Sequence, residues 1–310
     1  MLEALSYGLT VAIQVGILFV LIFAGLLMGK YKVVNKVGID QFTDFLLYII
    51  TPCLIVNAFL KVEYNDSTVT QLLISAACAV LCHLVGIIIA FAFKKIQPIS
   101  KQAVYRFGII FSNGGFMALP LVQALIGEKG VFLVSPYVIA INVFTWTYGV
   151  ALFKSDKKTS KLKAFLNPGV LGILIGLPLF LLRIPVHEII AKPVAYLAEI
   201  NTPIAMIITG YCLLHSNIKQ GLRDKMMWIT SVIRLIVIPL IMLVVFKYVM
   251  QLQGDLLIAC MVPACAPCAV NNMMISAKFG GDTETASRLI PFTTLISIIT
   301  IPLMLVLTKL

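Results

Sequence analysis

The sequence predicts an all-α polytopic membrane protein with ten transmembrane helices. Of its 310 residues, 60% are hydrophobic and only 12% are charged, and the mean hydropathy is +1.03. Soluble globular domains carry about 25% charged residues, so this composition excludes them. A helix needs about 20 apolar residues to cross the hydrocarbon core, and runs of that kind recur along the whole chain.

We expect the ten spans, in chain order, near residues 9–28, 39–60, 70–93, 103–126, 131–153, 168–183, 189–214, 226–249, 256–278 and 286–307. The first run is too long for the core of a signal peptide, and no basic residue precedes it. We therefore expect it to be a helix of the folded protein.

The net charge of +11 follows the loops between these spans. Lysine and arginine gather at residues 30–36, 94–101, 154–163, 219–225 and 278–288, in alternate loops, and are sparse in the others. Such asymmetry marks the basic side as cytoplasmic. The sequence therefore predicts a multi-pass protein of the cell membrane with both termini extracellular, surrounded by the lipid bilayer and with no nucleic-acid partner.

The chain divides into two halves of five spans each. The basic linker at residues 154–166 separates residues 1–153 from residues 167–310. An odd number of spans per half makes the second half enter the membrane from the opposite side, so the repeat must be inverted. Short echoes agree with this: Thr51-Pro52 in the second span corresponds to Thr202-Pro203 in the seventh.

Two spans in corresponding positions are interrupted by proline and glycine. The fourth carries Ser112 to Pro120 and the ninth carries Pro263 to Asn272. A broken helix at bilayer depth is tolerated where protein or a water-filled cavity satisfies the freed backbone groups. The half-helix after each break directs its positive end at the midplane, which is where an anion can bind. We expect helices 4 and 9 to be broken crossover helices, with the half-helix after the first break at residues 121–126 and the one after the second at residues 268–278.

The side chains at the breaks suit an anionic ligand. Asn113, Asn271 and Asn272 offer amide donors without a buried charge, and Gly114 and Gly115 allow close approach to the backbone. The alternative is structural: an intramembrane Asn can bond to a neighbouring helix, and a proline can kink only its own.

Two ionisable residues inside predicted spans are coupling candidates. Glu199 lies one turn before Pro203 and could carry a coupling proton or bind a cation. Arg234 could pair with Glu199 or attract the substrate anion.

The seven cysteines all fall within predicted spans. Cys265 and Cys268 have the spacing of a dithiol pair, so a membrane thiol oxidoreductase is an alternative function. Signatures of soluble enzymes, such as a P-loop or HExxH, do not occur in the sequence. We therefore expect a protein that is not an enzyme, with no cofactor and no metal site.

The breaks resemble a known family. The run from Asn113 to Pro120, followed by Gly127, is similar to the fourth helix of the auxin efflux carriers, which include bacterial malate-permease-like members, and the stretch from Pro267 to Pro302 is similar to their last two helices. The resemblance implies two inverted five-helix repeats with crossing broken helices and transport of an organic anion by alternating access. It implies substrate contacts for these residues: Asn113, Pro120, Pro267, Asn271, Asn272, Thr51, Asn201 and Thr202.

The chain departs from the plant members of that family in two ways. It lacks their long central loop, and it has Asn113-Gly-Gly where they have Asn-Pro. Auxin itself is therefore not the expected substrate. We expect a secondary transporter for a small organic anion, such as malate or an auxin-like acid, with a proton or a sodium ion as candidate coupling ion and a homodimer as candidate assembly. A sodium-coupled carrier of the bile-acid symporter type is the alternative within transport.

Overall fold

A computed structural model describes residues 2–153, 168–215 and 221–309. Within these ranges the chain is helical and contains no strand. Seven of its helical stretches are long and apolar enough to cross a membrane, and two shorter helices, α8 and α14, are also apolar. The prediction of an all-helical polytopic membrane protein is therefore confirmed for the described residues.

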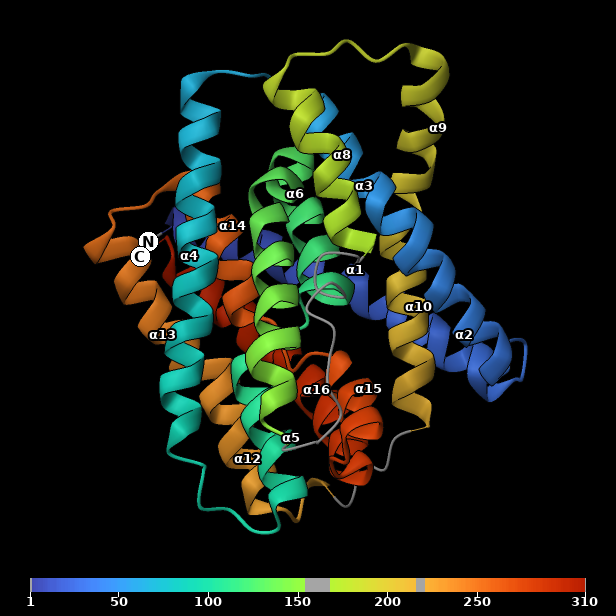
Figure 1. Ribbon diagram of the computed structural model, residues 1–310, viewed down its shortest axis with the longest axis vertical. Helices are drawn as coiled ribbons and strands as arrows, with labels where there is room; N and C mark the ends of the chain where they lie inside the picture. Colours follow the sequence, from blue (N-terminus) through green and yellow to red (C-terminus); the bar gives the residue numbers. More distant parts are fainter. Residues whose placement is uncertain (1, 154–167, 216–220, 310) are drawn as a thin grey trace.

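The described residues of the first half of the chain form nine elements (Figure 1). They are α1 (Leu2–Lys30), α2 (Lys36–Phe45), η1 (Leu46–Ile50), α3 (Thr51–Lys61), α4 (Asp66–Phe91), α5 (Ile99–Ile110), η2 (Gly114–Ala118) and α6 (Leu119–Phe144), with η3 (Thr145–Gly149) continuing α6. The second half forms α8 (Pro168–Leu181), α9 (Glu188–Glu199), α10 (Asn201–Leu214), α12 (Lys225–Val232), η4 (Ile233–Val237), α13 (Ile238–Leu243), η5 (Val244–Val249), α14 (Gly254–Cys265), α15 (Asn271–Phe279) and α16 (Thr283–Leu307).

Helix α6 contains a sharp kink that divides it in two. Ile126 and Gly127 have non-helical backbone angles, and Gly127 adopts φ 64°, in the region where a side chain would be strained. The continuous stretch from Gly114 to Gly149 is therefore two helical segments that meet at a turn. The sequence places the boundary between its fourth and fifth spans at this turn.

Three wide helical turns precede prolines in the same register. The π-helical turns η1, η2 and η4 each end two residues before a proline, namely Pro52, Pro120 and Pro239. Proline has no backbone N–H and its ring clashes with the carbonyl four residues earlier. The turn before it widens to relieve that clash, so the helix continues instead of breaking there.

Glycines let two pairs of helices pack closely. A Cβ atom on Gly25 of α1 would lie 2.2 Å from the carbonyl oxygen of Ile207, and one on Gly210 of α10 would lie 1.9 Å from that of Ile22. Gly172 of α8 is similarly close to the backbone of Pro52 in α3. Backbones that approach this closely are typical of membrane helices held together by small residues.

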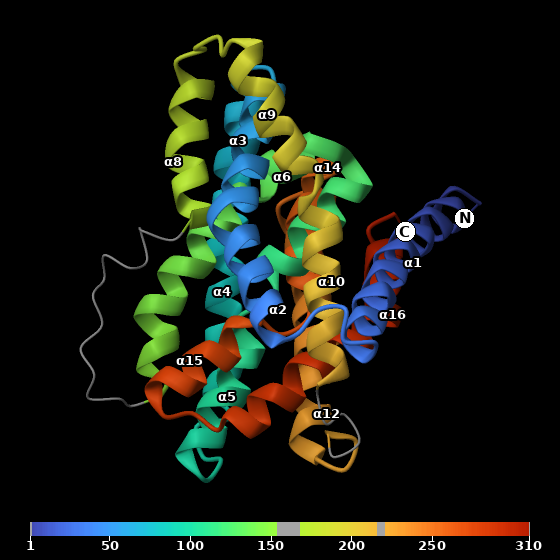
Figure 2. The ribbon, with the colours of Figure 1, turned by 90° about the vertical axis from the view of Figure 1, so that its right-hand side faces the viewer.

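Several helices, among them α4, α8 and α10, run roughly along the long axis of the molecule, and α1 lies obliquely to them (Figures 1 and 2). Helices α3, α8 and α9 reach one end of the molecule, and α5, α12 and α15 reach the other. Helix α1 packs on α10 and α16. The many exposed apolar side chains, such as Val20, Ile88 and Ile299, are what a lipid-facing surface requires.

Candidate functional site

The two interruptions of the chain meet and pair with one another. The backbone N–H of Asn113 donates to the carbonyl of Pro267 at 2.7 Å, and that of Ala269 donates to the carbonyl of Phe111 at 3.0 Å. Together these bonds form an isolated antiparallel bridge between Ser112 and Cys268. Each broken segment thus satisfies backbone groups that the other has freed.

Four helix ends converge at this bridge. Helices α5 and α14 end just before the extended residues, and the helical turns of η2 and α15 begin just after them. The first N–H groups of a helix and its last carbonyls have no partner inside the helix. The bridge therefore brings together two partially positive ends and two partially negative ends.

The first break lies earlier in the chain than the sequence suggests. We expected the new half-helix to begin after Pro120, but it begins at Gly114, and Pro120 is buried within a continuous helix. In the second break, the new helix begins at Asn271 and not at Cys268. The cause is the accommodation of Pro120 by the π-helical turn before it, which leaves Phe111, Ser112 and Asn113 as the extended residues.

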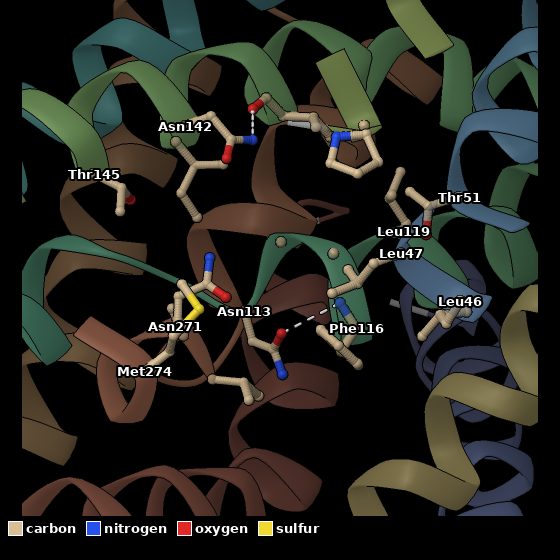
Figure 3. A pocket seen from close by; sticks show the side chains of 18 of the residues that line it. Leu46, Leu47, Thr51, Asn113, Phe116, Leu119, Asn142, Thr145, Asn271 and Met274 are labelled. Atoms are coloured by element: carbon tan, nitrogen blue, oxygen red, sulfur yellow. Dashed lines mark hydrogen bonds between the residues drawn. The ribbon is translucent and has the colours of Figure 1, made fainter. Parts of the chain in front are cut away.

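A cavity of about 420 Å³ opens beside the positive ends. This volume is within the range of small-molecule sites in proteins. Figure 3 shows the cavity with side chains of α15, the first break, α6 and the η1–α3 region around it. Its polar lining residues, with one cation among them, are Tyr48, Thr51, Ser112, Asn113, Asn142, Thr145, Trp146, Asn271 and Lys278.

Asn113 is the polar centre of this lining. Its Oδ1 accepts a hydrogen bond from the backbone N–H of Phe116 at 3.3 Å and so caps the new helix. Its Nδ2 is buried and has no hydrogen-bond partner in the structure, and the residue as a whole is only 3% exposed. A buried donor left without a partner is costly, so this amide is suited to a bound acceptor.

The other predicted cavity residues surround Asn113. Asn271 is the first residue of α15, and Thr51 is the first residue of α3. Gly114 and Gly115 line the cavity too, and the space where a Cβ of Gly115 would lie is open. Five of the residues predicted from the sequence therefore lie together around one space.

Several lining residues were missed. Asn142 and Thr145 lie on one face of α6 and η3, three residues apart, and Asn142 donates to the carbonyl of Val138 at 2.7 Å. Polar residues three apart inside an apolar span could have indicated this face. Lys278, near the end of α15, is the only charged residue among the described residues that line the cavity.

Other predicted site residues lie outside the cavity. Asn272 is fully buried and donates to the carbonyl of Val104 at 3.0 Å, so its amide joins α15 to α5. Asn201 is buried at the start of α10, Pro267 contributes its carbonyl to the bridge, and Glu199 is exposed at the end of α9. None of these four, nor Pro120 or Thr202, lines the cavity.

Arg234 does not pair with Glu199 in the described part of the chain. The arginine is fully buried, and its guanidinium donates to four backbone carbonyls. Three of them, at Pro263, Ala264 and Ala266, belong to the end of α14, and the fourth, at Ile109, belongs to the end of α5. Because these four acceptors are carbonyls at helix ends, Arg234 neutralises the negative ends of α5 and α14.

A chain of polar contacts lies away from the cavity. Thr202 contacts Gln123 at 3.4 Å, Gln123 contacts Glu128 at 3.4 Å, and Glu128 lies 3.8 Å from Lys61. Lys61 is ten residues beyond Thr51 along one helix, which corresponds to about 15 Å. These contacts therefore join α10, α6 and α3 at a level distant from the cavity.

Cys265 and Cys268 are free and buried, and the thiol of Cys268 donates to the carbonyl of Gly108 at 3.2 Å. The structure thus gives this thiol a contact between the broken helices.

A family model described as membrane transport protein matches residues 10–162 and 157–305. The two stretches together cover most of the chain. No curated protein matches it.

Proposed function

The chain belongs to the membrane transport protein family, that of the auxin efflux carriers and malate permeases, and on this premise we propose that it is a secondary transporter for a small organic anion. It would move the anion across the cell membrane by alternating access. The family makes the protein a membrane transporter. The class of substrate and the mechanism are our proposal, and they depend on the cavity.

One observation carries the proposal: the cavity has donors and a cation but no carboxylate among its described lining residues. Asn113 lines the cavity and its buried amide nitrogen has no partner, the first residues of η2 and α15 line the same space, and Lys278 is its charged lining residue. Helix N-termini bind anions through their free N–H groups and their dipoles. A carboxylate of the substrate would bind at Asn113 and Asn271, where it meets neutral donors.

We further propose ten spans arranged as two inverted repeats, residues 1–153 and 167–310. The kink at Gly127 supports this count because it divides one long stretch into two spans. The glycine contacts support the inversion: α1 of the first half packs on α10 of the second, and α8 of the second packs on α3 of the first. The linker at residues 154–166 lies outside the described residues.

In this proposal the structure is the inward-facing state. The cavity extends toward Tyr48, Trp146 and Lys278, near the basic loops that we expect in the cytoplasm. On the opposite side, the contacts from Thr202 through Gln123 and Glu128 to Lys61 would keep the path closed. During transport the cytoplasmic side would close and the opposite side would open. The helices joined by the bridge between Ser112 and Cys268 would move against α1, α3, α8 and α10.

Proton coupling through Glu199 is a further proposal. If its carboxylate carries the proton, then Glu199→Gln protein should transport at a rate that no longer varies with pH. A pH profile equal to that of the parent protein would remove Glu199 from the mechanism.

The test of the main proposal uses purified protein in two formats. A thermal-shift screen against carboxylates, indole acids and bile acids would find a stabilising ligand, with malate as the first probe. Counterflow of the radiolabelled ligand into proteoliposomes would then measure transport. We expect a carboxylate to stabilise the protein and to exchange across the bilayer. Stabilisation by cations or neutral solutes only, with no exchange of any carboxylate, would contradict the proposal.

A further inference from the structure

The buried guanidinium of Arg234 lies at a place where a bound metal cation would otherwise be favourable. Nε donates to Ala266 at 3.0 Å, Nη1 to Ile109 at 3.2 Å, and Nη2 to Pro263 at 3.2 Å and Ala264 at 2.6 Å. All four acceptors are backbone carbonyls at the ends of two interrupted helices. Hard cations such as calcium and magnesium take oxygen ligands of this kind.

The electrostatics of the site require a positive charge. Each helix end carries about half a negative elementary charge, and α5 and α14 end beside each other at the bridge. Two such ends together approach one full charge, buried where water does not screen it. A buried cation is costly unless it is compensated, and no ion pair of Arg234 occurs in the described part of the chain. The helix ends and the arginine therefore compensate each other.

The local backbone is adapted to this contact. Arg234 is in η4, a π-helical turn inside the long stretch from Lys225 to Val249. Turns of this type re-aim side chains and are frequent at functional sites. Arginine also suits the position, because its fork of five donors reaches carbonyls in several directions.

We propose that Arg234 is the built-in cation of the two broken helices, a positioning residue that occupies the place of a coupling metal ion. The bridge then stays closed without sodium, and transport does not depend on sodium. Arg234 binds the carbonyl of Ala266, which lies three residues before the cavity-lining residue Ala269. The charge of the guanidinium therefore also adds a positive potential near the anion site. This last consequence rests on the proposed function.

The experiment removes the positive charge of Arg234 by substitution and then supplies sodium ions, which could bind in its place. Arg234→Gln removes the charge and keeps an amide donor, whereas Arg234→Lys keeps the charge and loses the fork. Arg106→Gln is the matched control, because Arg106 is another arginine of a predicted span but donates to the hydroxyl of Tyr148. The thermal midpoint of each purified protein is measured in sodium chloride and in choline chloride, and malate counterflow is measured in the same salts.

We expect the midpoint of Arg234→Gln to be about 5 °C or more below the parent in choline and to recover in sodium. Parent, Arg234→Lys and Arg106→Gln should each have equal midpoints in the two salts. Counterflow by Arg234→Gln should fall at least tenfold in choline and return partly in sodium.

The proposal is overturned if Arg234→Gln is as stable as the parent in choline, or if sodium stabilises parent and variant equally. If Arg234→Gln does not fold in either salt, Arg234→Lys decides: sodium dependence of its midpoint would show that retained charge is not sufficient. Thermal midpoints need no substrate. A parent protein that carries no carboxylate would therefore refute the proposed function while leaving this test intact.

Discussion

Asn113→Asp is the substitution that tests the anion site most directly. The new carboxylate can still accept the hydrogen bond from Phe116, so the cap at the start of η2 is retained. The unpartnered donor of Asn113, however, becomes an acceptor with a negative charge. A carboxylate ligand would lose one charge-assisted hydrogen bond and gain a repulsion.

The hydrogen bond alone is worth about 1.5–3 kcal/mol. That corresponds to a loss of affinity of about 10- to 150-fold, and the added repulsion increases it. We therefore expect the dissociation constant of the stabilising carboxylate to rise at least about 100-fold. The assay is a ligand titration of the thermal midpoint, repeated as the half-saturation concentration of counterflow.

Asn272→Ala is the matched control. Asn272 is the neighbour of Asn271 in the second break, but it donates to the carbonyl of Val104 and lies outside the cavity. Its loss removes the hydrogen bond that joins α15 to α5, which costs about 0.5–1.5 kcal/mol of stability, while ligand affinity should be unchanged. If folded Asn113→Asp protein binds the ligand nearly as tightly as the parent, the anion site is not at Asn113.

Two further substitutions test the cavity and the packing. Lys278→Gln should weaken binding of a dicarboxylate about two- to fivefold more than binding of a monocarboxylate, because an exposed cation contributes little binding free energy. Equal losses of affinity for malate and lactate would exclude a role of Lys278 in charge selection. Gly210→Ala should lower the free energy of unfolding by about 1–3 kcal/mol, since its Cβ would meet the carbonyl of Ile22, whereas Gly16→Ala, with open space around it, should not. Chemical denaturation compares the two, and similar losses would refute the packing argument.

The sequence was sufficient to predict the class of fold and the region of the site. Composition and the length of apolar runs determine a membrane bundle, because lipid leaves few alternatives to the helix. Asn113, Asn271 and the two glycines that follow Asn113 were found because asparagine and glycine interrupt an otherwise apolar span. These signals depend only on the residue types within one span, so they can be recognised from the sequence alone.

What could not be predicted depends on contacts between distant segments. Asn272 has the same chemistry and nearly the same position as Asn271, but one faces α5 and the other faces the cavity. Nothing in the sequence around Arg234 indicates that its partners are four backbone carbonyls of distant segments. The predicted start of the first half-helix was also wrong. A proline usually indicates a helix break, but here the π-helical turn η2 accommodates Pro120 within a continuous helix.

The bridge between Ser112 and Cys268 limits how such a protein can work. Two hydrogen bonds tie the halves of the binding region to each other, one from each side. If one interrupted segment moved alone, both hydrogen bonds would break and leave buried backbone groups of the two segments without partners. In the proposed transport cycle the two segments would therefore move together, and a substrate bound beside them would keep its contacts with both.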